Sequence, residues 1–443
     1  MLFFSPTGWG EELSRLELKL DRGYYVKDLQ NTIYLEARIH TGGTSFGQRR
    51  SRLNVAMLVD RSGSMEGEKL GETKAMLRGA LDQLSSNDAF SIVSYGSDTR
   101  VDSPAMVVDS LKAIDPLIES LVAEGGSSLG DGIAEAAMQL RKHREESSIN
   151  RIFLVSDGKP TKGLRDLEGF ADLAGELAAE GIAISAIGLG DAFDEEILYS
   201  LASASGGTFQ SVPNPDDLSK VVFEELNQLN QAFAKDAVLE IVFDSGIVID
   251  ETLGRPAETS RRRAFFRFDH LYPHQELSVI LQATQSAGGR FSFDTRIARA
   301  SLSYTRLDSG EAIRIEESVR ARYTDSTEHS FESIDERVLK AACSFEVANT
   351  IRKAYRLYDE GKPRRALSEL KKTARSFRFI EAEFEAIELD EQLEEINRSI
   401  EAIESRALEV IDRKALMSTL YQRTHRGVSA NNSGVKAEAN LEE

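Results

Sequence analysis

Three segments of the chain end or interrupt an apolar run with oxygen-bearing side chains. In "LNVAMLVDRSGSM", Asp60, Ser62 and Ser64 stand at alternate positions after a continuous hydrophobic stretch, and "RIFLVSD" ends in Asp157 in the same way. A third segment, "AEGGSSLGDGI", places Ser127 just before a predicted helix. Hydroxyl and carboxylate oxygens are the ligands that Mg²⁺ and Mn²⁺ prefer in proteins. If the three segments converge, they predict a divalent-cation site.

Convergence requires a parallel sheet, and the pattern from Leu53 to about Ala234 predicts one. Continuous apolar strands alternate there with amphipathic helices, which is typical of an α/β domain with a doubly wound, mostly parallel sheet. The carboxyl ends of such strands lie along one edge, and ligands bind where the strand order reverses. We therefore expect both aspartates and the serines at that edge.

Different patterns flank this α/β unit and predict further regions. Period-two apolarity on both sides of it indicates antiparallel strands, and the last third of the chain has helical periodicity. We expect N-terminal strands in 1–48, the α/β domain in 49–235, a β-sandwich in 236–325 that the N-terminal strands complete, a helical region in 326–428 and a disordered tail in 429–443. The helical region should hold a hairpin of tetratricopeptide type and a long helix from about Ile380 to Glu409.

The three oxygen-bearing segments resemble the metal-ion-dependent adhesion site of the von Willebrand factor A domain. "DRSGS" is similar to the family's Asp-x-Ser-x-Ser signature, "GGSSLGDGI" lies in the place of its threonine loop, and "VSDGKP" matches its final aspartate motif. The three parts occur in the family's order, which makes the combination specific. The resemblance covers about residues 52–234. The flanking regions resemble bacterial multidomain proteins of this family, some of them similar to calcium-activated chloride channel proteins.

The resemblance implies a role for each residue of the motif. Ser62 and Ser64 are expected to coordinate the cation directly, whereas the two aspartates act mainly through bound waters and by charge. Ser127 stands where the family usually has threonine, and the adjacent Ser128 leaves the ligand from this loop undecided. Few direct carboxylate ligands favour Mg²⁺, with Ca²⁺ or Mn²⁺ as alternatives. The open coordination position would receive a carboxylate from a partner protein.

Three classes of function are compatible with these residues. The favoured class is a non-enzymatic module that binds a protein partner through the cation. A metal-dependent hydrolase or phosphatase would need a general acid or base, and the site loops offer no obvious one, although Lys159 is near Asp157 in sequence. A structural scaffold that uses no metal is the third class.

Composition restricts the partner and the compartment. The 443 residues carry a formal net charge of −19, which argues against a nucleic-acid binder. The single cysteine, Cys343, suits a reducing compartment and a buried core position. No segment is apolar over the length that a membrane helix needs, so we expect a cytoplasmic protein without membrane insertion. The sequence does not indicate the oligomeric state. His270 and His274 flank Pro273 and are expected in a solvated loop rather than a zinc site.

Overall fold

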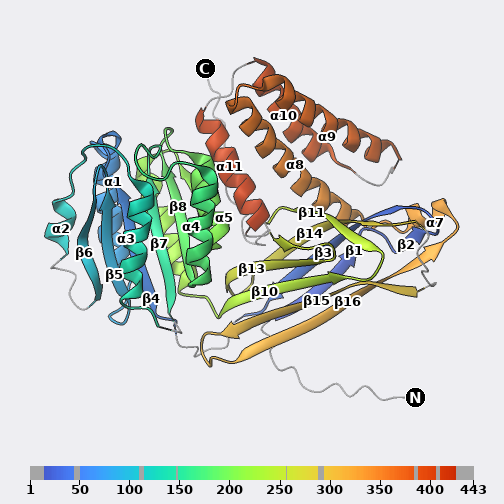
Figure 1. Cartoon of the computed structure of the whole chain (residues 1–443), viewed down its shortest axis with the longest axis horizontal. Helices are drawn as coiled ribbons and strands as arrows, with labels where there is room; N and C mark the ends of the chain where they lie inside the picture. Colours follow the sequence, from blue (N-terminus) through green and yellow to red (C-terminus); the bar gives the residue numbers. More distant parts are fainter. Residues whose placement is uncertain are drawn as a thin grey trace.

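The computed structural model describes residues 14–43, 50–108, 114–145, 148–255, 257–287, 294–383, 388–405 and 410–425. These residues form an α/β domain, a β-sandwich and a helical region, with the helices above the sandwich and beside the α/β domain in Figure 1. The tail expected to be disordered, 429–443, lies outside this set, as do residues 1–13. Within the described ranges no helix has the length and apolarity needed to cross a membrane.

The α/β domain is built on a six-stranded sheet with the order β6-β5-β4-β7-β8-β9. Its strands are β4 (Leu53–Asp60), β5 (Ala89–Tyr95), β6 (Thr99–Val107), β7 (Ile149–Ser156), β8 (Ile182–Leu189) and β9 (Thr208–Val212). Strands β4, β5, β7 and β8 are buried over their whole length, as their continuous apolar sequences predict. The edge strand β6 runs antiparallel to β5 and was not predicted. It contains Pro104, which an edge strand tolerates.

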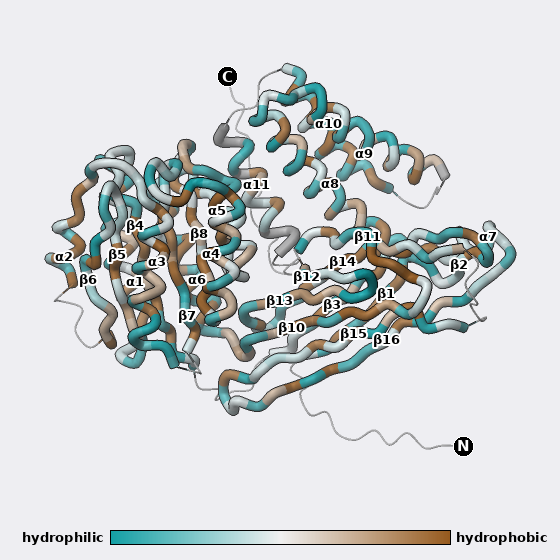
Figure 2. The backbone as a smooth tube through the Cα atoms, viewed as in Figure 1, coloured by the Kyte–Doolittle hydropathy of each residue, from teal (hydrophilic) through white to brown (hydrophobic). Residues whose placement is uncertain are grey.

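Helices cover both faces of this sheet, which confirms the expected fold class. One face packs against α1 (Glu68–Asp82), α2 (Asp115–Glu119) and α6 (Leu218–Leu229), and the other against α3 (Leu129–Arg141), α4 (Leu167–Ala179) and α5 (Glu195–Ser205). The apolar colour of Figure 2 gathers in the central strands between these layers. The chain moves from β4 to β5 on one side and returns to β7 on the other, so the strand order reverses at β4.

The β-sandwich combines strands from before and after the α/β domain. One sheet has the order β1-β3-β14-β11 and the other β12-β13-β10-β15-β16-β2. The strands are β1 (Ser14–Leu20), β2 (Tyr24–Val26), β3 (Asn31–Thr41), β10 (Ala234–Phe243), β11 (Ile247–Leu253), β12 (Glu258–Thr259), β13 (Arg263–Leu271), β14 (Glu276–Gln285), β15 (Asp294–Arg306) and β16 (Ala312–Thr324). Alternate side chains of both sheets, such as Leu35 and Leu239, meet in one core.

The α/β domain is thus an insertion between β3 and β10, and its two connections meet the sandwich at neighbouring residues. The Thr41 hydroxyl donates to the carbonyl of Tyr272 over 2.5 Å where the chain leaves the sandwich. The Phe233 amide donates to the carbonyl of Leu271 over 3.0 Å where the chain returns.

The helical region contains α7 (Thr327–Glu332), α8 (Glu336–Asp359), α9 (Pro363–Glu383), α10 (Asp390–Ser405) and α11 (Val410–His425). Helices α8 and α9 form the expected hairpin, with Gly361 in the left-handed region at φ 73° at its turn. The prediction of one helix from Ile380 to Glu409 is wrong, because Glu388 and Leu389 are not helical. Cys343 is buried in this region, as expected, and burial raises the pKa of its thiol to about 12.

Helix α11 joins the helical region to the α/β domain at the edge strand β9 (Figure 1). The Tyr421 hydroxyl donates to the carbonyl of Gly207 over 3.0 Å, and the Tyr421 ring lies edge-on to Tyr199 with the centroids 5.1 Å apart. Arg413 forms an ion pair with Glu195 over 2.5 Å. These contacts cover the edge of β9 and fix the two regions to each other.

Candidate metal centre

The carboxyl ends of β4 and β7 bring the two predicted aspartates to the same edge of the sheet. These strands are parallel neighbours, and their register pairs Val59 with Val155. Asp60 ends β4 and Asp157 follows β7, and both side chains are fully buried. The short 3₁₀ helix Gly63–Met65 follows Asp60 and places Ser64 over the gap between the strands. This is where the strand order reverses, the usual ligand position in doubly wound sheets.

Three of the predicted oxygens lie within hydrogen-bonding distance in a row. The Ser62 and Ser64 hydroxyl oxygens are 3.1 Å apart, and the Ser64 hydroxyl donates to Oδ1 of Asp157 over 2.8 Å. Adjacent ligands of an octahedral Mg²⁺ with bonds of about 2.1 Å are separated by about 3 Å. The two separations, 3.1 and 2.8 Å, are therefore of the size found between neighbouring ligands of one such cation.

Asp60 lies behind this row and orients it. Its Oδ1 accepts a hydrogen bond from the Ser62 amide over 2.8 Å, and its Oδ2 lies 3.3 Å from the Ser156 hydroxyl. Burial raises the pKa of the Asp60 carboxyl, since hydrogen bonds from Ser62 offset the loss of solvation only in part, and the negative charge of Asp157 raises it further. Asp60 is thus a buried carboxylate whose charge the surrounding protein does not fully balance.

The third loop distinguishes the two candidate serines. The Ser128 hydroxyl donates to Oδ2 of Asp131 over 2.5 Å, so it is already engaged at the start of α3. Asp131 accepts that bond from within the first turn of the helix. Ser127 is buried and is fixed by its main chain, since its amide donates to Oγ1 of Thr161 over 2.8 Å and its carbonyl accepts from the Thr161 amide over 2.9 Å.

Lys69 is a residue of this centre that the sequence interpretation missed. Its ammonium group lies 2.6 Å from Oδ2 of Asp157, and its side chain is 25% exposed. Lys69 stands in the first turn of α1, where the helix dipole disfavours a cation. A lysine in the first turn of a helix, nine residues after Asp60, could have indicated that a carboxylate from another part of the chain balances it.

Arg61, the variable residue of "DRSGS", connects the loops around the centre. Its side chain is buried and forms ion pairs with Asp98 and with Glu124, the latter over 3.0 Å. Gly125 contributes a second link, because its carbonyl accepts from the Gly63 amide over 3.2 Å. The backbone at Gly125 has φ 76°, a conformation that favours glycine, and an added Cβ atom there would collide with Ser97. These contacts pre-organise the loops, and a pattern search for metal ligands does not detect them.

The described part of the chain contains no cluster of three or more His, Cys, Asp and Glu side chains arranged to hold a metal. The centre therefore depends on hydroxyl groups together with two carboxylates, a donor set suited to a hard cation that keeps several waters. We expected His270 in a solvated loop, and this prediction is wrong, because His270 is buried in β13.

At the amino-terminal ends of its strands, the α/β sheet meets the sandwich, and a different group of charged side chains lies there. Arg151, which is buried on β7, donates to Oδ2 of Asp269 over 2.7 Å, and Nδ1 of His270 lies 2.8 Å from the same oxygen. Burial alone would raise the pKa of Asp269, but His270 and Arg151 hold it below its ordinary value. Arg151 supplies this carboxylate with a counter-charge from the protein itself.

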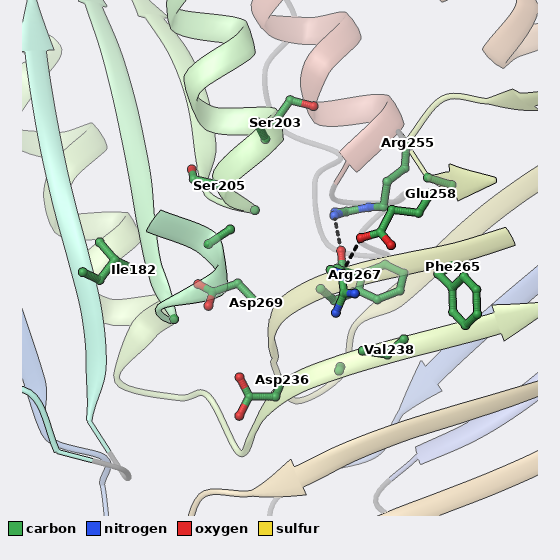
Figure 3. A pocket seen from close by; sticks show the side chains of 17 residues that line it. Ile182, Ser203, Ser205, Asp236, Val238, Arg255, Glu258, Phe265, Arg267 and Asp269 are labelled. Atoms are coloured by element: carbon green, nitrogen blue, oxygen red, sulfur yellow. Dashed lines mark hydrogen bonds and ion pairs between the residues drawn. The ribbon is translucent and has the colours of Figure 1, made fainter. Parts of the chain in front are cut away.

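A cavity of about 360 Å³ lies beside Asp269 between the two domains (Figure 3). Ser203 and Ser205 line it from the end of α5, and Arg255 and Arg267 line it from the sandwich. The charges of the arginines are engaged, since Arg267 pairs with Glu258 over 3.0 Å and Arg255 lies over the ring of Phe268. The cavity is at the end of the sheet away from the predicted metal residues and contributes nothing to them.

Comparison with known proteins agrees with this architecture. The sequence profile of the von Willebrand factor type A domain matches residues 54–224. The uncharacterized protein YfbK of Escherichia coli is 28% identical over 199 residues, which are 44% of this chain and 35% of YfbK. This chain therefore matches about a third of the length of that relative.

Two solved structures resemble most of the chain. A von Willebrand factor type A protein from Catenulispora acidiphila has a TM-score of 0.68 at 18% identity, over 83% of this chain and 87% of that one. The ArnB paralog VWA2 from Sulfolobus acidocaldarius has a TM-score of 0.62 at 18% identity, over 94% of this chain and all of that one. At this identity the likeness concerns the fold. The profile match assigns a von Willebrand factor type A domain to residues 54–224, and the sheet topology of that region agrees with it.

Proposed function

We propose that the chain is a non-enzymatic protein-binding module that holds a divalent cation at Asp60, Ser62, Ser64, Ser127 and Asp157. The family is one of protein-interaction modules. The observation that carries the proposal is the row of oxygens from Ser62, Ser64 and Asp157, with separations of 3.1 and 2.8 Å. Mg²⁺ is the preferred cation, because the row supplies few direct carboxylates and leaves room for waters.

The charges of the centre support a cation. Asp60 and Asp157 are both fully buried, and Lys69 offsets one of their two negative charges. A buried charge without a partner is unfavourable, so a bound cation would relieve the raised pKa of Asp60. Ser62 and Ser64 would contact the cation directly, and the aspartates would act mainly through waters and by charge.

The sum of the charges at the centre indicates what the bound cation would attract. A divalent cation added to two aspartates and one lysine leaves the centre with a net charge of about +1. Ser64 and Gly63 are exposed, so the loop presents this charge at the surface. A carboxylate from a partner protein would complete the coordination and neutralise the centre, and it would let an acidic protein bind an acidic residue.

The first test is calorimetric titration of the protein with MnCl₂ and MgCl₂. We expect one bound cation per chain, and a loss of affinity of about 100-fold or more in Asp60→Ala and in Ser62→Ala. Asp172→Ala is the matched control, because it removes an exposed carboxylate of α4 outside the site. Binding that persists in both site variants would overturn the proposed centre.

The second test concerns the partner. Proteins captured on the immobilised chain should differ between Mg²⁺ and EDTA, and the cation-dependent fraction should be absent with Asp60→Ala and present with Asp172→Ala. Capture that is identical in EDTA and in all variants would support a metal-independent scaffold instead. Metal-dependent turnover of a generic phosphate ester, lost in Asp60→Asn, would support a hydrolase.

A further inference from the structure

Helix α9 exposes six cationic side chains on one face. They are Arg364, Arg365, Lys371, Lys372, Arg375 and Arg378. With 3.6 residues per turn, these positions fall on one side of the helix. We call this set the basic face of α9.

No acidic residue interrupts this face among the α9 side chains that the structure describes. Glu369 and Glu381 are half-buried, and both are engaged. Glu369 pairs with Lys353 of α8 over 2.9 Å, and Glu381 accepts a hydrogen bond from the Leu389 amide over 2.8 Å. The cations are therefore not neutralised along their own helix.

Neighbouring elements also leave most of the face unbalanced. Lys371 pairs with Glu404 of α10 over 2.5 Å. Within the described ranges the other five cations form no ion pair, although Lys372 and Arg365 act at longer range on the carboxylates of Glu346 and Glu360. The whole sequence has 54 basic and 73 acidic residues, so a helix face with six exposed cations and no acidic side chain of its own departs from the average.

An exposed aromatic ring ends the basic face. Phe379 is 64% exposed and lies one helical turn beyond Arg375. The tube of α9 in Figure 2 carries both hydrophilic and hydrophobic colour, as expected of an amphipathic helix, and Phe379 is one of its exposed residues. Large exposed aromatics beside arginine are characteristic of protein-binding surfaces, in which the ring is desolvated by the partner.

We propose that the basic face of α9 is a second docking surface, which binds an acidic segment of a partner protein and packs an apolar residue of that segment on Phe379. From Arg364 to Arg378 the face is about 21 Å long at 1.5 Å per residue. An extended segment of about six residues would cover that length. The net charge of −19 opposes binding to nucleic acid or an anionic membrane, whereas a short acidic segment meets only the local field.

This surface needs no cation and lies on a different region from the proposed metal centre, so the two proposals fail separately. The probe is a fluorescein-labelled peptide of about eight residues, all glutamate except for one leucine, followed by fluorescence anisotropy in EDTA. We expect binding that weakens with added salt, because exposed charges are screened. Asp60→Ala should bind the peptide as the wild type does.

Two double variants test the location of the surface. Arg375→Glu with Arg378→Glu should weaken peptide binding at least tenfold, and Arg375→Gln with Arg378→Gln by a smaller factor. Arg314→Glu with Arg262→Glu changes the net charge equally at two exposed sites of the sandwich, and it should leave binding within twofold of the wild type. Phe379→Ala should weaken binding without changing its dependence on salt.

Three results would overturn the proposal. One is equal weakening by the two charge-reversed pairs, which would indicate a non-specific field. Another is tighter binding of an oligonucleotide or of phosphatidylserine vesicles than of the peptide. The third is a dimer in sedimentation experiments that Arg375→Glu with Arg378→Glu dissociates, which would make a second copy of the chain the occupant.

Discussion

A carboxylate lies at each end of the strands of the α/β sheet, Asp60 at the carboxyl end and Asp269 of the sandwich at the opposite end, and their surroundings act on them in opposite ways. At the carboxyl edge, Asp60 is held by hydrogen bonds and lies near another negative charge, and its pKa is raised. At the opposite edge, Asp269 lies within 2.8 Å of Arg151 and His270, and its pKa is lowered. The second group is complete as a structural ion pair, whereas the first is short of positive charge. Charge balance separates the candidate metal centre from the structural contact.

The largest expected effect is on stability at the opposite edge. Asp269→Asn leaves the buried Arg151 without its counter-charge and should lower the free energy of unfolding by about 3 kcal/mol. Asp60→Asn, measured in EDTA, should leave the stability unchanged or raise it, because it removes an unbalanced buried charge. Urea denaturation of the three proteins measures both effects. Equal losses in the two variants would contradict the comparison.

The pH dependence sharpens the same contrast. Because the folded protein lowers the pKa of Asp269, its contribution to stability is complete above the unfolded pKa of about 3.9 and is lost as the pH falls through the folded value. The difference in stability between wild type and Asp269→Asn should therefore be constant from pH 7 to about 5 and shrink below about 4. A difference that grows on acidification would show that another group provides the stabilisation.

A smaller effect is expected at Lys69, the internal cation of the candidate centre. Lys69→Met removes a positive charge 2.6 Å from Asp157 and should tighten Mn²⁺ binding by about tenfold, roughly 1.4 kcal/mol. It should also weaken cation-dependent capture of a carboxylate, because the loaded centre loses positive charge. Lys74→Met on the same helix is the control, since Lys74 lies beside Glu119 instead. Weaker metal binding in Lys69→Met would show that Lys69 organises the loop rather than competes with the metal.

The smallest effect separates the two serines of the third loop. Ser127→Ala should weaken Mn²⁺ binding by about fivefold, near 1 kcal/mol, the worth of one hydroxyl contact. Ser128→Ala should change it by less than about twofold, because the Ser128 hydroxyl is engaged by Asp131. Titration calorimetry on both variants decides between them, and the reverse order would assign the ligand to Ser128.

The hydrophobic periodicity of the sequence predicted the parallel strands and the position of the two aspartates. Continuous apolar strands before Asp60 and Asp157 were sufficient to place both at one sheet edge, because parallel strands end together. Lys69 and Arg61 were missed, since their roles arise from contacts with residues far away in the chain. Strand β6 was missed because its apolar residues are few and Pro104 interrupts them, which only an edge position accommodates. His270 was misplaced because it lies against Asp269, whose other partner, Arg151, comes from the α/β domain.

The close spacing of the two connections at Tyr272 and Leu271 has a consequence for how the protein can be divided. Both connections between the α/β domain and the sandwich contact adjacent residues of the sandwich, Leu271 and Tyr272. A short linker between Thr41 and Phe233 could therefore close the sandwich without it, because neither β3 nor β10 takes its partners from the excised part. The strand pairing of the sandwich is thus independent of the α/β domain, whereas the helical region is not, because it shares an apolar core with that domain.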